Sequence, residues 1–402
     1  MFDLNQFIGK YVTKRPQSMF LKDIENNRDL LTKKIEGKSV LVVGGAGTIG
    51  SSFIKAVLPF KPASLVVVDT NENALAELTR DLRSTKGMYV PEDYVTYPMD
   101  FASPVFEKMF RNRGGFDVVG NFSAHKHVRS EKDIYSVEAL LQNNVLHAKL
   151  LLDLLSEFPP EEYFCVSTDK AANPVNIMGA SKRIMEDVIF AYSDKFPVKT
   201  ARFANVAFSN GSLPAGFITR LQKLQPISAP SDVKRYFVSP EESGQICMLS
   251  CMLGNNREIF FPRLEEEQMM TFDKIATALL QEHGYEVLEC VSDEEAIEKA
   301  EELKKGSNLY PVHYSGSDTS GEKAYEEFYT DSEKADLDRL KALGVVTDKP
   351  IPDKEKVKVL FDELTAVFEK EETTKEEVVA IMKAYLPNFE HIETGKSLDS
   401  KM

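Results

Sequence analysis

The feature that most constrains the fold of this chain is a regular alternation of short apolar runs with longer, helix-length segments. The apolar runs predict strands and the longer segments predict helices. Strands are expected at residues 39–43, 65–68, 94–97, 117–121, 163–167 and 198–204, with helices such as 71–83, 137–158 and 177–196 between them. An alternation that continues over about 170 residues predicts an α/β fold with a doubly wound parallel sheet and right-handed crossovers.

The alternation stops after residue 204, which divides the 402-residue chain into predicted parts. Residues 1–37 carry apolar side chains at helical spacing and are expected to form a packed arm. The sheet domain follows at 38–204, then a smaller α/β region at 205–332 and a charge-rich helical extension at 333–402. A helical stripe in the extension predicts a helix docked on the body of the protein, with a partner site as the alternative. The stripe consists of Val357, Leu360, Phe361, Leu364 and Phe368.

The composition argues against several classes of protein. The net charge of −14 disfavours nucleic-acid binding, because a phosphate backbone is bound through clustered Lys and Arg. No apolar run approaches the ~18–20 residues of a membrane helix, and no signal peptide is recognisable, so we expect a cytoplasmic protein without a membrane segment. Cys247 and Cys251 share a helix face, but two thiols without nearby histidines favour a core position over a metal site.

A glycine-rich loop, GGAGTIG at residues 44–50, follows the first predicted strand and leads into a helix. Gly44 permits a tight turn, Gly47 lets the backbone approach a pyrophosphate, and Gly50 lets the helix lie close to the sheet. The start of that helix supplies free N–H groups and the positive end of a dipole. The loop therefore predicts a Rossmann-type domain that binds a dinucleotide.

The residue that ends the second predicted strand indicates which dinucleotide binds. Asp69 can accept hydrogen bonds from both hydroxyls of an adenosine ribose and would repel a 2′-phosphate. The two residues that follow, Thr70 and Asn71, offer no arginine in compensation. NAD is therefore predicted in preference to NADP. Asp100, after the third strand, is placed to reach the adenine edge, with a helix N-cap role as the alternative.

These motifs resemble a known group of enzymes. The glycine loop, the segment AHKHV at 124–128 and the strand end STDK at 167–170 resemble the extended short-chain dehydrogenase/reductase superfamily. The longer string STDKAANPVNIMGASKR at 167–183 is similar to the nucleotide-sugar 4,6-dehydratases of bacterial surface-polysaccharide and flagellin-glycan pathways, which act on UDP-N-acetylglucosamine. The resemblance covers residues 38–330. The arm and residues 316–333 look closest to the short, soluble dehydratases of legionaminic acid synthesis.

The resemblance implies a set of site residues. Segments 202–206 and 209–212 resemble the family's surroundings of the sugar and diphosphate, and 234–238, 257–260 and 320–323 resemble its uridine and diphosphate contacts. The implied cofactor-binding residues are Gly44, Gly47, Thr48, Ile49, Gly50, Asp69, Asp100, Ser123, Ala124 and Lys182. The implied substrate-binding residues are Lys126, Asn205, Ser209, Asn210, Arg235 and Glu258. The implied catalytic residues are Thr168, Asp169, Lys170, Met178 and Lys182.

The resemblance also implies a reaction scheme. Hydride leaves sugar C4 for NAD, the resulting ketone acidifies the proton on C5, water leaves from C6, and the hydride returns to C6. Asp169 is expected to protonate the departing hydroxyl if partial burial favours its protonated form. Lys170 is expected to remove the C5 proton as an unpaired, neutral amine, which requires a pKa several units below the reference value near ~10.4. The alternative is that the two residues form a structural ion pair.

Met178 stands where most superfamily members carry a tyrosine that removes the proton from sugar O4. A thioether has no proton to exchange, so the base for this step is left open, and Asp169 acting in both steps is one proposal. Thr168 is expected to hydrogen-bond O4. Lys182 lies four residues after Met178, on the same helix face, and is expected to bind the nicotinamide ribose.

A methionine at this position resembles the family members that retain the configuration at C5. We therefore predict a lyase with bound NAD, a configuration-retaining UDP-N-acetylglucosamine 4,6-dehydratase. Its product would be UDP-2-acetamido-2,6-dideoxy-α-D-xylo-hex-4-ulose, used for legionaminic acid or bacillosamine-like glycans. The alternatives are an inverting 4,6-dehydratase, an enzyme that stops at a 5,6-ene, a C4 epimerase, and a non-catalytic NAD-binding sensor.

A homodimer or a higher homo-oligomer is also expected. The superfamily pairs through two helices, and the predicted helices at 137–158 and 177–196 carry more apolar positions than one buried stripe requires. These positions include Leu150, Leu151, Leu154, Ile184, Val188 and Ile189.

Overall fold

The computed structural model describes residues 2–127, 131–316 and 326–391. Its centre is a nine-stranded sheet in the order β15-β16-β11-β6-β5-β4-β1-β2-β3. Neighbours from β11 to β3 are parallel: β11 (Glu258–Pro262), β6 (Val198–Ala201), β5 (Glu162–Val166), β4 (Val118–Asn121), β1 (Ser39–Val43), β2 (Ser64–Asp69) and β3 (Asp93–Pro98). The order 3-2-1-4-5-6 within this run is that of a Rossmann fold. The predicted doubly wound sheet is confirmed.

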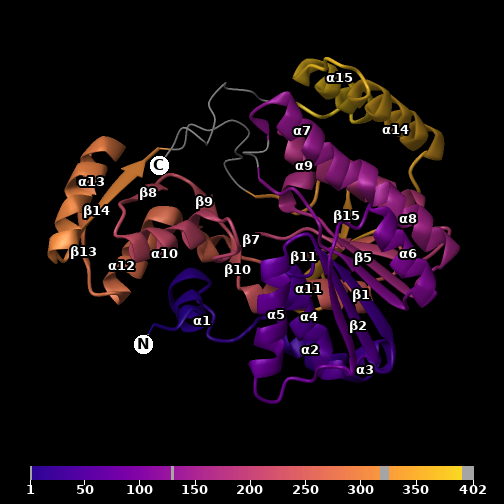
Figure 1. Cartoon of the computed structure of the whole chain (residues 1–402), viewed down its shortest axis with the longest axis horizontal. Helices are drawn as coiled ribbons and strands as arrows, with labels where there is room; N and C mark the ends of the chain where they lie inside the picture. Colours follow the sequence, from indigo (N-terminus) through magenta and orange to yellow (C-terminus); the bar gives the residue numbers. More distant parts are fainter. Residues whose placement is uncertain (1, 128–130, 317–325, 392–402) are drawn as a thin grey trace.

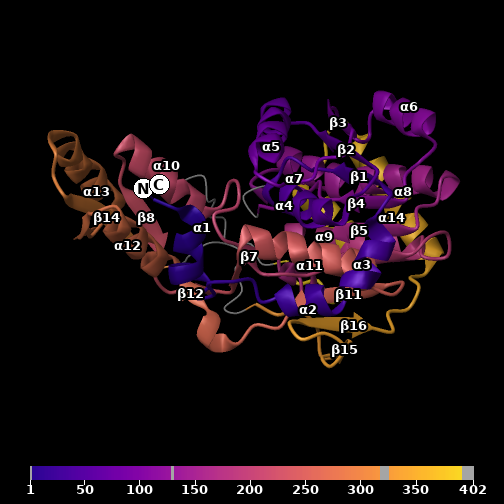
Figure 2. The same cartoon turned by 90° about the horizontal axis from the view of Figure 1, so that it is seen from below.

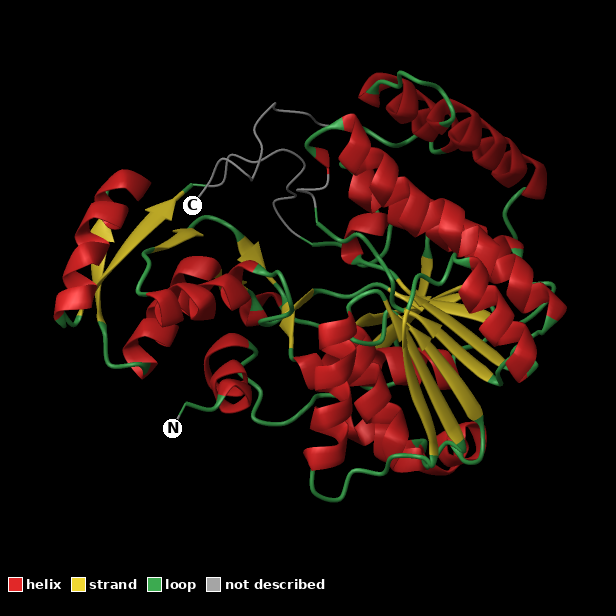
Figure 3. Ribbon diagram, viewed as in Figure 1, coloured by secondary structure: helices red, strands yellow, loops and turns green. Residues whose placement is uncertain are grey.

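Helices cover both faces of the sheet (Figure 3). One apolar core contains α3 (Arg28–Ile35), α4 (Thr48–Val57), α5 (Glu72–Ser84) and α11 (Pro240–Leu253). The other contains α6 (Pro104–Arg113), α7 (Ile134–Leu141), α8 (His147–Glu157) and α9 (Ile177–Ala191). In β1, Val40 and Val42 belong to the first core and Leu41 and Val43 to the second, because side chains alternate along a strand. Of the helices in the described ranges, none combines the length and apolar character of a membrane span.

A smaller body lies beside the large sheet (Figures 1 and 2). Its sheet has the order β13-β14-β8. The body comprises β8 (Ile227–Pro230), β13 (Glu286–Cys290), β14 (Leu309–Ser315), α10 (Leu213–Lys223), α12 (Phe272–Glu282) and α13 (Asp293–Lys299). Two short strand pairs lie along the connections between the bodies: β7 (Asn205–Val206) with β10 (Phe237–Val238), and β9 (Lys234–Arg235) with β12 (Met270–Thr271). The stretch predicted as one region at 205–332 divides between the bodies, since α11 and β11 return to the large sheet.

The N-terminal arm is packed, as its apolar spacing predicted, and it contacts both bodies. Phe7, at the end of α1 (Leu4–Phe7), is buried in the core of the smaller body. The hydroxyl of Tyr11 donates a hydrogen bond to Glu282 of α12, 2.8 Å away. The guanidinium of Arg15 pairs with Glu242 of α11 at 2.7 Å. The arm therefore links the smaller body to the large one.

The C-terminal part begins with strands and not with helix. The sequence predicted helix from residue 333, but β15 (Lys334–Asp336) and β16 (Leu343–Thr347) extend the large sheet in antiparallel fashion. Two helices follow, α14 (Lys354–Phe368) and α15 (Lys375–Tyr385), and they lie over α9 and α8 (Figure 1). The predicted stripe is confirmed as a docking face, because its first four members are buried in the core that also contains α9.

This pair of helices covers the outer side of α9. All residues of α9 are buried except Arg183 and Asp187. Ile184, Val188 and Ile189, which supported the expectation of a dimer, are thus covered within one chain. Leu151 and Leu154 of α8 are buried as well, and Leu150 is 51% exposed. A homo-oligomer stays a prediction, and most of the apolar surface that motivated it is covered by the chain itself.

Candidate active site

The glycine loop has the shape that its sequence predicted. Gly44 has a φ of +71°, and a Cβ atom there would lie 2.5 Å from the backbone nitrogen of Ser123. A Cβ atom on Gly50 would collide with the carbonyl oxygen of Gly44. At Gly47 the nearest atom to an added Cβ is 3.5 Å away, so the backbone is open there. Gly47 is also the N-cap residue of α4, and the free N–H groups of the first turn of this helix lie beside the open space.

The carboxylate of Asp69 lies beside this loop at the end of β2. It accepts hydrogen bonds from the backbone N–H groups of Ala46, at 3.0 Å, and Asn71, at 2.9 Å. Asp100 is exposed and accepts from the N–H of Ala102, while the N-cap of α6 is Ser103. The alternative of an N-cap role for Asp100 is therefore wrong. Its contact with an adenine stays a prediction.

Residues after β4 form the next wall of the site, and a buried asparagine holds them in place. The amide of Asn144 accepts from the N–H of His125 at 2.9 Å and donates to the carbonyl of His125 at 3.0 Å. It also donates to the hydroxyl of Ser181 on α9. Ser123 donates to the neighbouring Asn143 at 3.1 Å. These contacts fix the predicted cofactor residues Ser123 and Ala124 relative to α9.

Asn143 and Asn144 lie in a π-helical turn, Gln142–Leu146, that interrupts the helix predicted at 137–158. Such turns widen a helix locally and are frequent at functional sites. The sequence analysis missed both residues. The available signal was a pair of amide side chains within an otherwise apolar helix.

Three predicted residues meet where the glycine loop faces the loop after β7. The ammonium of Lys126 donates to the carbonyl oxygen of Asn210 at 3.0 Å. The N–H of Asn210 donates to the hydroxyl of Thr48, 2.9 Å away at the start of α4. Ser209 is buried in the same turn and donates its N–H to Val206. The structure thus brings predicted substrate residues against a predicted cofactor residue.

Asp169 and Lys170 lie on a 3-10 turn, Asp169–Ala171, that follows β5. The turn lets adjacent residues face the same space, which strand alternation would prevent. Asp169 is buried, and its Oδ1 accepts from the hydroxyl of Thr168 at 2.7 Å. The Nζ of Lys170 is 3.3 Å from Oδ1 and 3.4 Å from Oδ2 of Asp169. The two residues form a close ion pair at the carboxyl edge of the sheet.

The expectation of an unpaired, neutral Lys170 is wrong. Burial acts to lower the pKa of Lys170, but the negative charges of Asp169 and Glu326 outweigh burial and raise it. Lys170 is therefore an ammonium at neutral pH. Any role as a base requires a change in its surroundings.

Glu326 is a functional candidate that the sequence analysis did not single out. It is 8% exposed and completes the surroundings of the Asp169–Lys170 pair. Burial, reinforced by the charge of Asp169, raises the pKa of Glu326 to about 7 against the opposing charges of Lys170 and Arg235. The signal in the sequence was a carboxylate between aromatic residues in the segment YEEF, a setting that favours burial.

Met178 and Lys182 lie on one face of α9, as their spacing predicted. Both side chains are buried, and burial lowers the pKa of Lys182. Its Nζ lies 3.6 Å from the sulfur of Met185. The N–H of Met178 donates to Oε1 of Glu131 at 2.9 Å. Glu131 in turn accepts from the ammonium of Lys375 on α15 through its carbonyl oxygen, at 2.8 Å.

Residues 40–347 match the family model described as "Polysaccharide biosynthesis protein". The chain belongs to this family.

Its relatives include proteins of varied description. An uncharacterized membrane protein of Methanocaldococcus jannaschii is 28% identical over 86% of this chain and 95% of its own length. The capsular polysaccharide biosynthesis protein CapD of Staphylococcus aureus is 26% identical over 76% of this chain, which spans 50% of that relative's length. A UDP-N-acetylglucosamine 4,6-dehydratase (inverting) of Campylobacter jejuni subsp. jejuni is 24% identical over 73% of this chain and 82% of its own length.

Solved structures share the fold. The structure of Pen from Bacillus thuringiensis has a TM-score of 0.61 at 20% identity and covers 79% of this chain and 90% of that chain. DesIV, a dTDP-glucose 4,6-dehydratase from Streptomyces venezuelae solved with NAD and TYD bound, has a TM-score of 0.54 at 20% identity, covering 72% and 87%. These similarities support the Rossmann-type fold of this family member.

One predicted substrate residue of this family member lies at the wrong edge of the sheet. Glu258 begins β11 and is in register with Lys199, near the amino end of β6. The turn that carries Asp169 and Lys170 follows the carboxyl end of β5, the neighbour of β6. Both oxygens of Glu258 accept from the guanidinium of Arg339, at 2.9 and 2.7 Å. The assignment of Glu258 to substrate binding is therefore wrong, and its role is structural.

Arg202 also has a structural role, although its segment resembled the sugar surroundings. The side chain is fully buried between Glu186 of α9, at 2.6 Å, and Glu333, at 2.7 Å. Ser167, which directly follows β5, donates to Glu186 at 2.6 Å. Burial acts against ionisation of Glu333, but its contacts with Arg202 and Lys349 outweigh burial and lower its pKa to about 2. This buried network fastens α9 to the sheet below the turn that carries Asp169 and Lys170.

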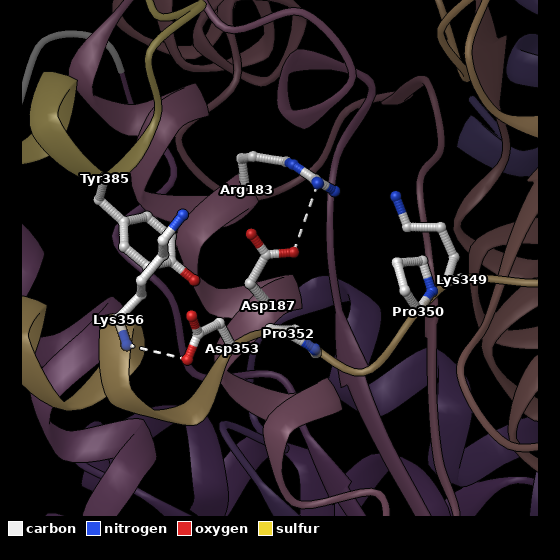
Figure 4. Close-up of a pocket in the computed structure, with 8 residues that line it drawn as sticks. All are labelled: Arg183, Asp187, Lys349, Pro350, Pro352, Asp353, Lys356 and Tyr385. Atoms are coloured by element: carbon white, nitrogen blue, oxygen red, sulfur yellow. Dashed lines mark hydrogen bonds and ion pairs between the residues drawn. The ribbon is translucent and has the colours of Figure 1, made fainter.

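A shallow pocket lies on the outer side of this network, between α9 and the C-terminal helices (Figure 4). Arg183 and Asp187 of α9 pair there at 3.3 Å, and Tyr385 of α15 lies opposite them. None of the predicted site residues lines this pocket. The segment 320–323, which resembled a diphosphate contact, lies outside the described residues.

Proposed function

We propose that this protein is a UDP-N-acetylglucosamine 4,6-dehydratase that holds NAD and retains the configuration at C5. Its product would be UDP-2-acetamido-2,6-dideoxy-α-D-xylo-hex-4-ulose, for bacterial glycan synthesis. The observation that carries the proposal is the ion pair of Asp169 and Lys170 beside Met178 and Lys182 of α9. An acid and an amine side by side suit an elimination, in which one group protonates the leaving hydroxyl and the other removes a carbon-bound proton.

The residues around the glycine loop fit NAD. The open space at Gly47 beside the start of α4 suits a pyrophosphate. Asp69 at the end of β2 suits a ribose with two free hydroxyls. Lys182 would lie under the nicotinamide ribose. When bound, NAD supplies the acceptor and donor of the hydride that leaves C4 and returns to C6.

The remaining steps would be performed by side chains of this chain. Thr168 would hydrogen-bond O4 of the sugar. Asp169 would take the proton from O4 and give it to the C6 hydroxyl, which then leaves as water. Lys170, once it has released its extra proton, would take the C5 proton and return it to the same face of C5. One proton thus moves from O4 to the departing water, and a second leaves and rejoins C5.

Two observations favour a dehydratase over the alternatives. A C4 epimerase needs no acid–lysine pair, and it depends on the tyrosine whose position Met178 occupies. A non-catalytic sensor has no use for a buried carboxylate paired with a lysine, because the desolvation of Asp169 costs free energy without a return in function. The 24% identity to a UDP-N-acetylglucosamine 4,6-dehydratase is consistent with the proposal. That relative is described as inverting, so an inverting product, or a 5,6-ene, is the second candidate.

Proton NMR of the product made from UDP-N-acetylglucosamine in heavy water tests the proposal. We expect the D-xylo 4-keto-6-deoxy sugar, with solvent deuterium at C5 if the proton on Lys170 exchanges during the cycle. Couplings across C5 distinguish this product from the L-arabino epimer. The L-arabino sugar at early times would show that the enzyme inverts C5. An unchanged substrate would reject the dehydratase assignment.

A further inference from the structure

One short loop contacts two walls of the predicted dinucleotide site. Residues 208–211, which we call the clasp, lie between β7 and α10. The backbone N–H of Asn210 donates to the hydroxyl of Thr48 at 2.9 Å, and its carbonyl oxygen accepts from the ammonium of Lys126 at 3.0 Å. Thr48 lies in the loop region after β1, and Lys126 lies in the loop after β4. The clasp therefore connects the segments that follow these two strands.

The place of β1 and β4 in the sheet shows what the clasp spans. The two strands are neighbours, and the direction of the strand order 3-2-1-4-5-6 changes between them. In an open parallel sheet, ligands bind outside the carboxyl ends of the strands, in the crevice at such a switch point. The open space at Gly47 lies at this edge. The clasp thus bridges the crevice in which the proposed function puts NAD.

The N-terminal arm supports the clasp from the smaller body. The buried ring of Phe208 packs edge-on against Phe7, with the ring centroids 5.8 Å apart. Phe208 has a φ of +54°, which a bulky residue keeps only where its surroundings enforce it. Arg15 of the arm donates to the carbonyl oxygen of Phe237 at 3.0 Å, on β10, which pairs with β7. The arm therefore holds both the clasp and the strand pair that leads into it.

We infer that the clasp closes the dinucleotide site and that the arm keeps it closed. NAD then enters and leaves only when the contacts of Asn210 open. The inference rests on the proposed function for the identity of the cofactor. Because these contacts are made with other parts of this chain, opening limits entry and release alike. Such a gate suits a reaction that returns its hydride from the same nicotinamide, since NAD need not leave between turnovers.

Two variants weaken the clasp from opposite sides. Lys126→Met removes the side chain that donates to Asn210. Phe7→Leu keeps an apolar side chain in the arm and removes the ring that packs on Phe208. Neither change touches the glycine loop. Both variants should therefore open the clasp more often and leave the bed of the cofactor as it is.

Each variant has a matched control. Lys55→Met removes the same charge from α4, where Lys55 pairs with Asp81 on the exposed surface. Phe272→Leu makes the same substitution in the smaller body. The ring of Phe272 packs edge-on against Phe237, with the centroids also 5.8 Å apart. The controls separate opening of the clasp from a lost charge and from a loosened core.

The rates of NAD release and entry are measured without UDP-sugar. Release is followed by chasing bound, radiolabelled NAD with an excess of unlabelled NAD. Entry is followed by mixing labelled NAD with full-length protein stripped on charcoal. We expect each test variant to speed both rates by about fivefold, the effect of losing one hydrogen bond or one aromatic contact, with the Kd of NAD unchanged. The controls should match wild type.

Two results would overturn the inference. Faster release with unchanged entry in Lys126→Met would mean that Lys126 binds NAD itself. Wild-type rates in both test variants would mean that the clasp does not close the site. Thermal unfolding shows whether Phe7→Leu still folds, and Lys126→Met changes an exposed residue and tests the clasp in any case.

The same measurements separate this inference from the proposed function. Expected rates in a protein that dehydrates no UDP-sugar would reject the proposed function and leave the clasp standing. Dehydration with wild-type exchange rates in both test variants would do the reverse. A wild-type protein that binds no NAD would overturn both.

Discussion

The backbone N–H of Met178 donates a hydrogen bond to the carboxylate of Glu131, 2.9 Å away, and so fixes the first turn of α9. Glu131 is itself held by the C-terminal part of the chain. Lys375 donates to its carbonyl oxygen, and the imidazole of His391 lies 3.7 Å from its carboxylate. The position of a predicted catalytic residue thus depends on residues about 200 positions away in the sequence.

This relationship predicts different effects for two substitutions at one position. Glu131→Ala removes the acceptor for Met178, so kcat should fall by up to about 100-fold, the effect of a misplaced catalytic helix. Glu131→Gln keeps an oxygen that can accept the same hydrogen bond, and its kcat should stay near wild type. Steady-state kinetics of both variants checks this. Equal losses in the two variants would show that the charge of Glu131, and not its hydrogen bond to Met178, is what matters.

Asp169→Asn and Lys170→Ala should each reduce dehydration by ~10²–10⁴-fold, the usual effect of removing a general acid or base. Binding of NAD and UDP-sugar should change little, because neither substitution alters the glycine loop or the loop that contacts it. Turnover by NMR and binding by calorimetry provide the two readouts. Lys304→Ala, at an exposed lysine paired with Glu301, is the control. Near-normal turnover in either test variant would mean that the pair is structural.

Gly50→Ala should abolish NAD retention and destabilise the protein, because the added methyl group meets the carbonyl of Gly44. Gly216→Ala is the matched control. Gly216 lies within α10 with open space around it, and alanine there should stabilise the helix by about 0.5–1 kcal/mol. Nicotinamide released by heating the purified proteins, together with thermal unfolding, measures both effects. Retained NAD in Gly50→Ala would contradict the close approach of α4 to the loop.

Arg202→Met should lower the free energy of unfolding by about 3–5 kcal/mol, since it leaves Glu186 and Glu333 as buried charges without their main partner. Arg80→Met removes an exposed arginine that pairs with Glu77, and no measurable change is expected. Urea unfolding of both variants tests the contrast. A small loss for Arg202→Met would indicate that water or Lys349 replaces the missing arginine.

Acid should weaken the protein through Glu333. Its pKa is lowered from 4.5 in the unfolded chain to about 2 in the fold. The unfolded state therefore binds the proton first, and the stabilisation from Glu333 is complete above pH 4.5 and is lost as the pH falls toward 2. Unfolding free energies measured between pH 5 and pH 2 should fall more steeply for wild type than for Glu333→Gln. Parallel curves would show that other carboxylates dominate the acid response.

The parts of the fold that the sequence predicted are those governed by local rules. β1 matches the predicted strand at 39–43, because a buried parallel strand must be apolar on both faces. The glycine loop was predictable because nearby backbone atoms leave no room for a side chain at Gly44 and Gly50. The sequence motifs named Lys126, Asn210 and Thr48 as site residues. The order of these motifs along the chain is the one that brings their loops together in this fold.

Residues whose roles depend on distant parts of the chain were not predictable in the same way. The charge of Lys170 depends on Glu326, which the fold brings in from more than 150 residues away. Glu258 was misplaced because similarity in sequence does not tell which edge of a sheet a residue occupies. β15 was missed because two of its three residues are charged, and β16 was missed because its short apolar run pairs with β11, which is distant in the sequence.

The covering of α9 by α14 and α15 has a consequence for how the protein responds to dilution. Surfaces that are covered by a second molecule lose that cover as the concentration falls, because the binding equilibrium follows mass action. Here the cover is part of the same chain, so its local concentration is set by the connecting segment and not by the amount of protein present. The helix that carries Met178 and Lys182 keeps this support at nanomolar and millimolar concentration alike.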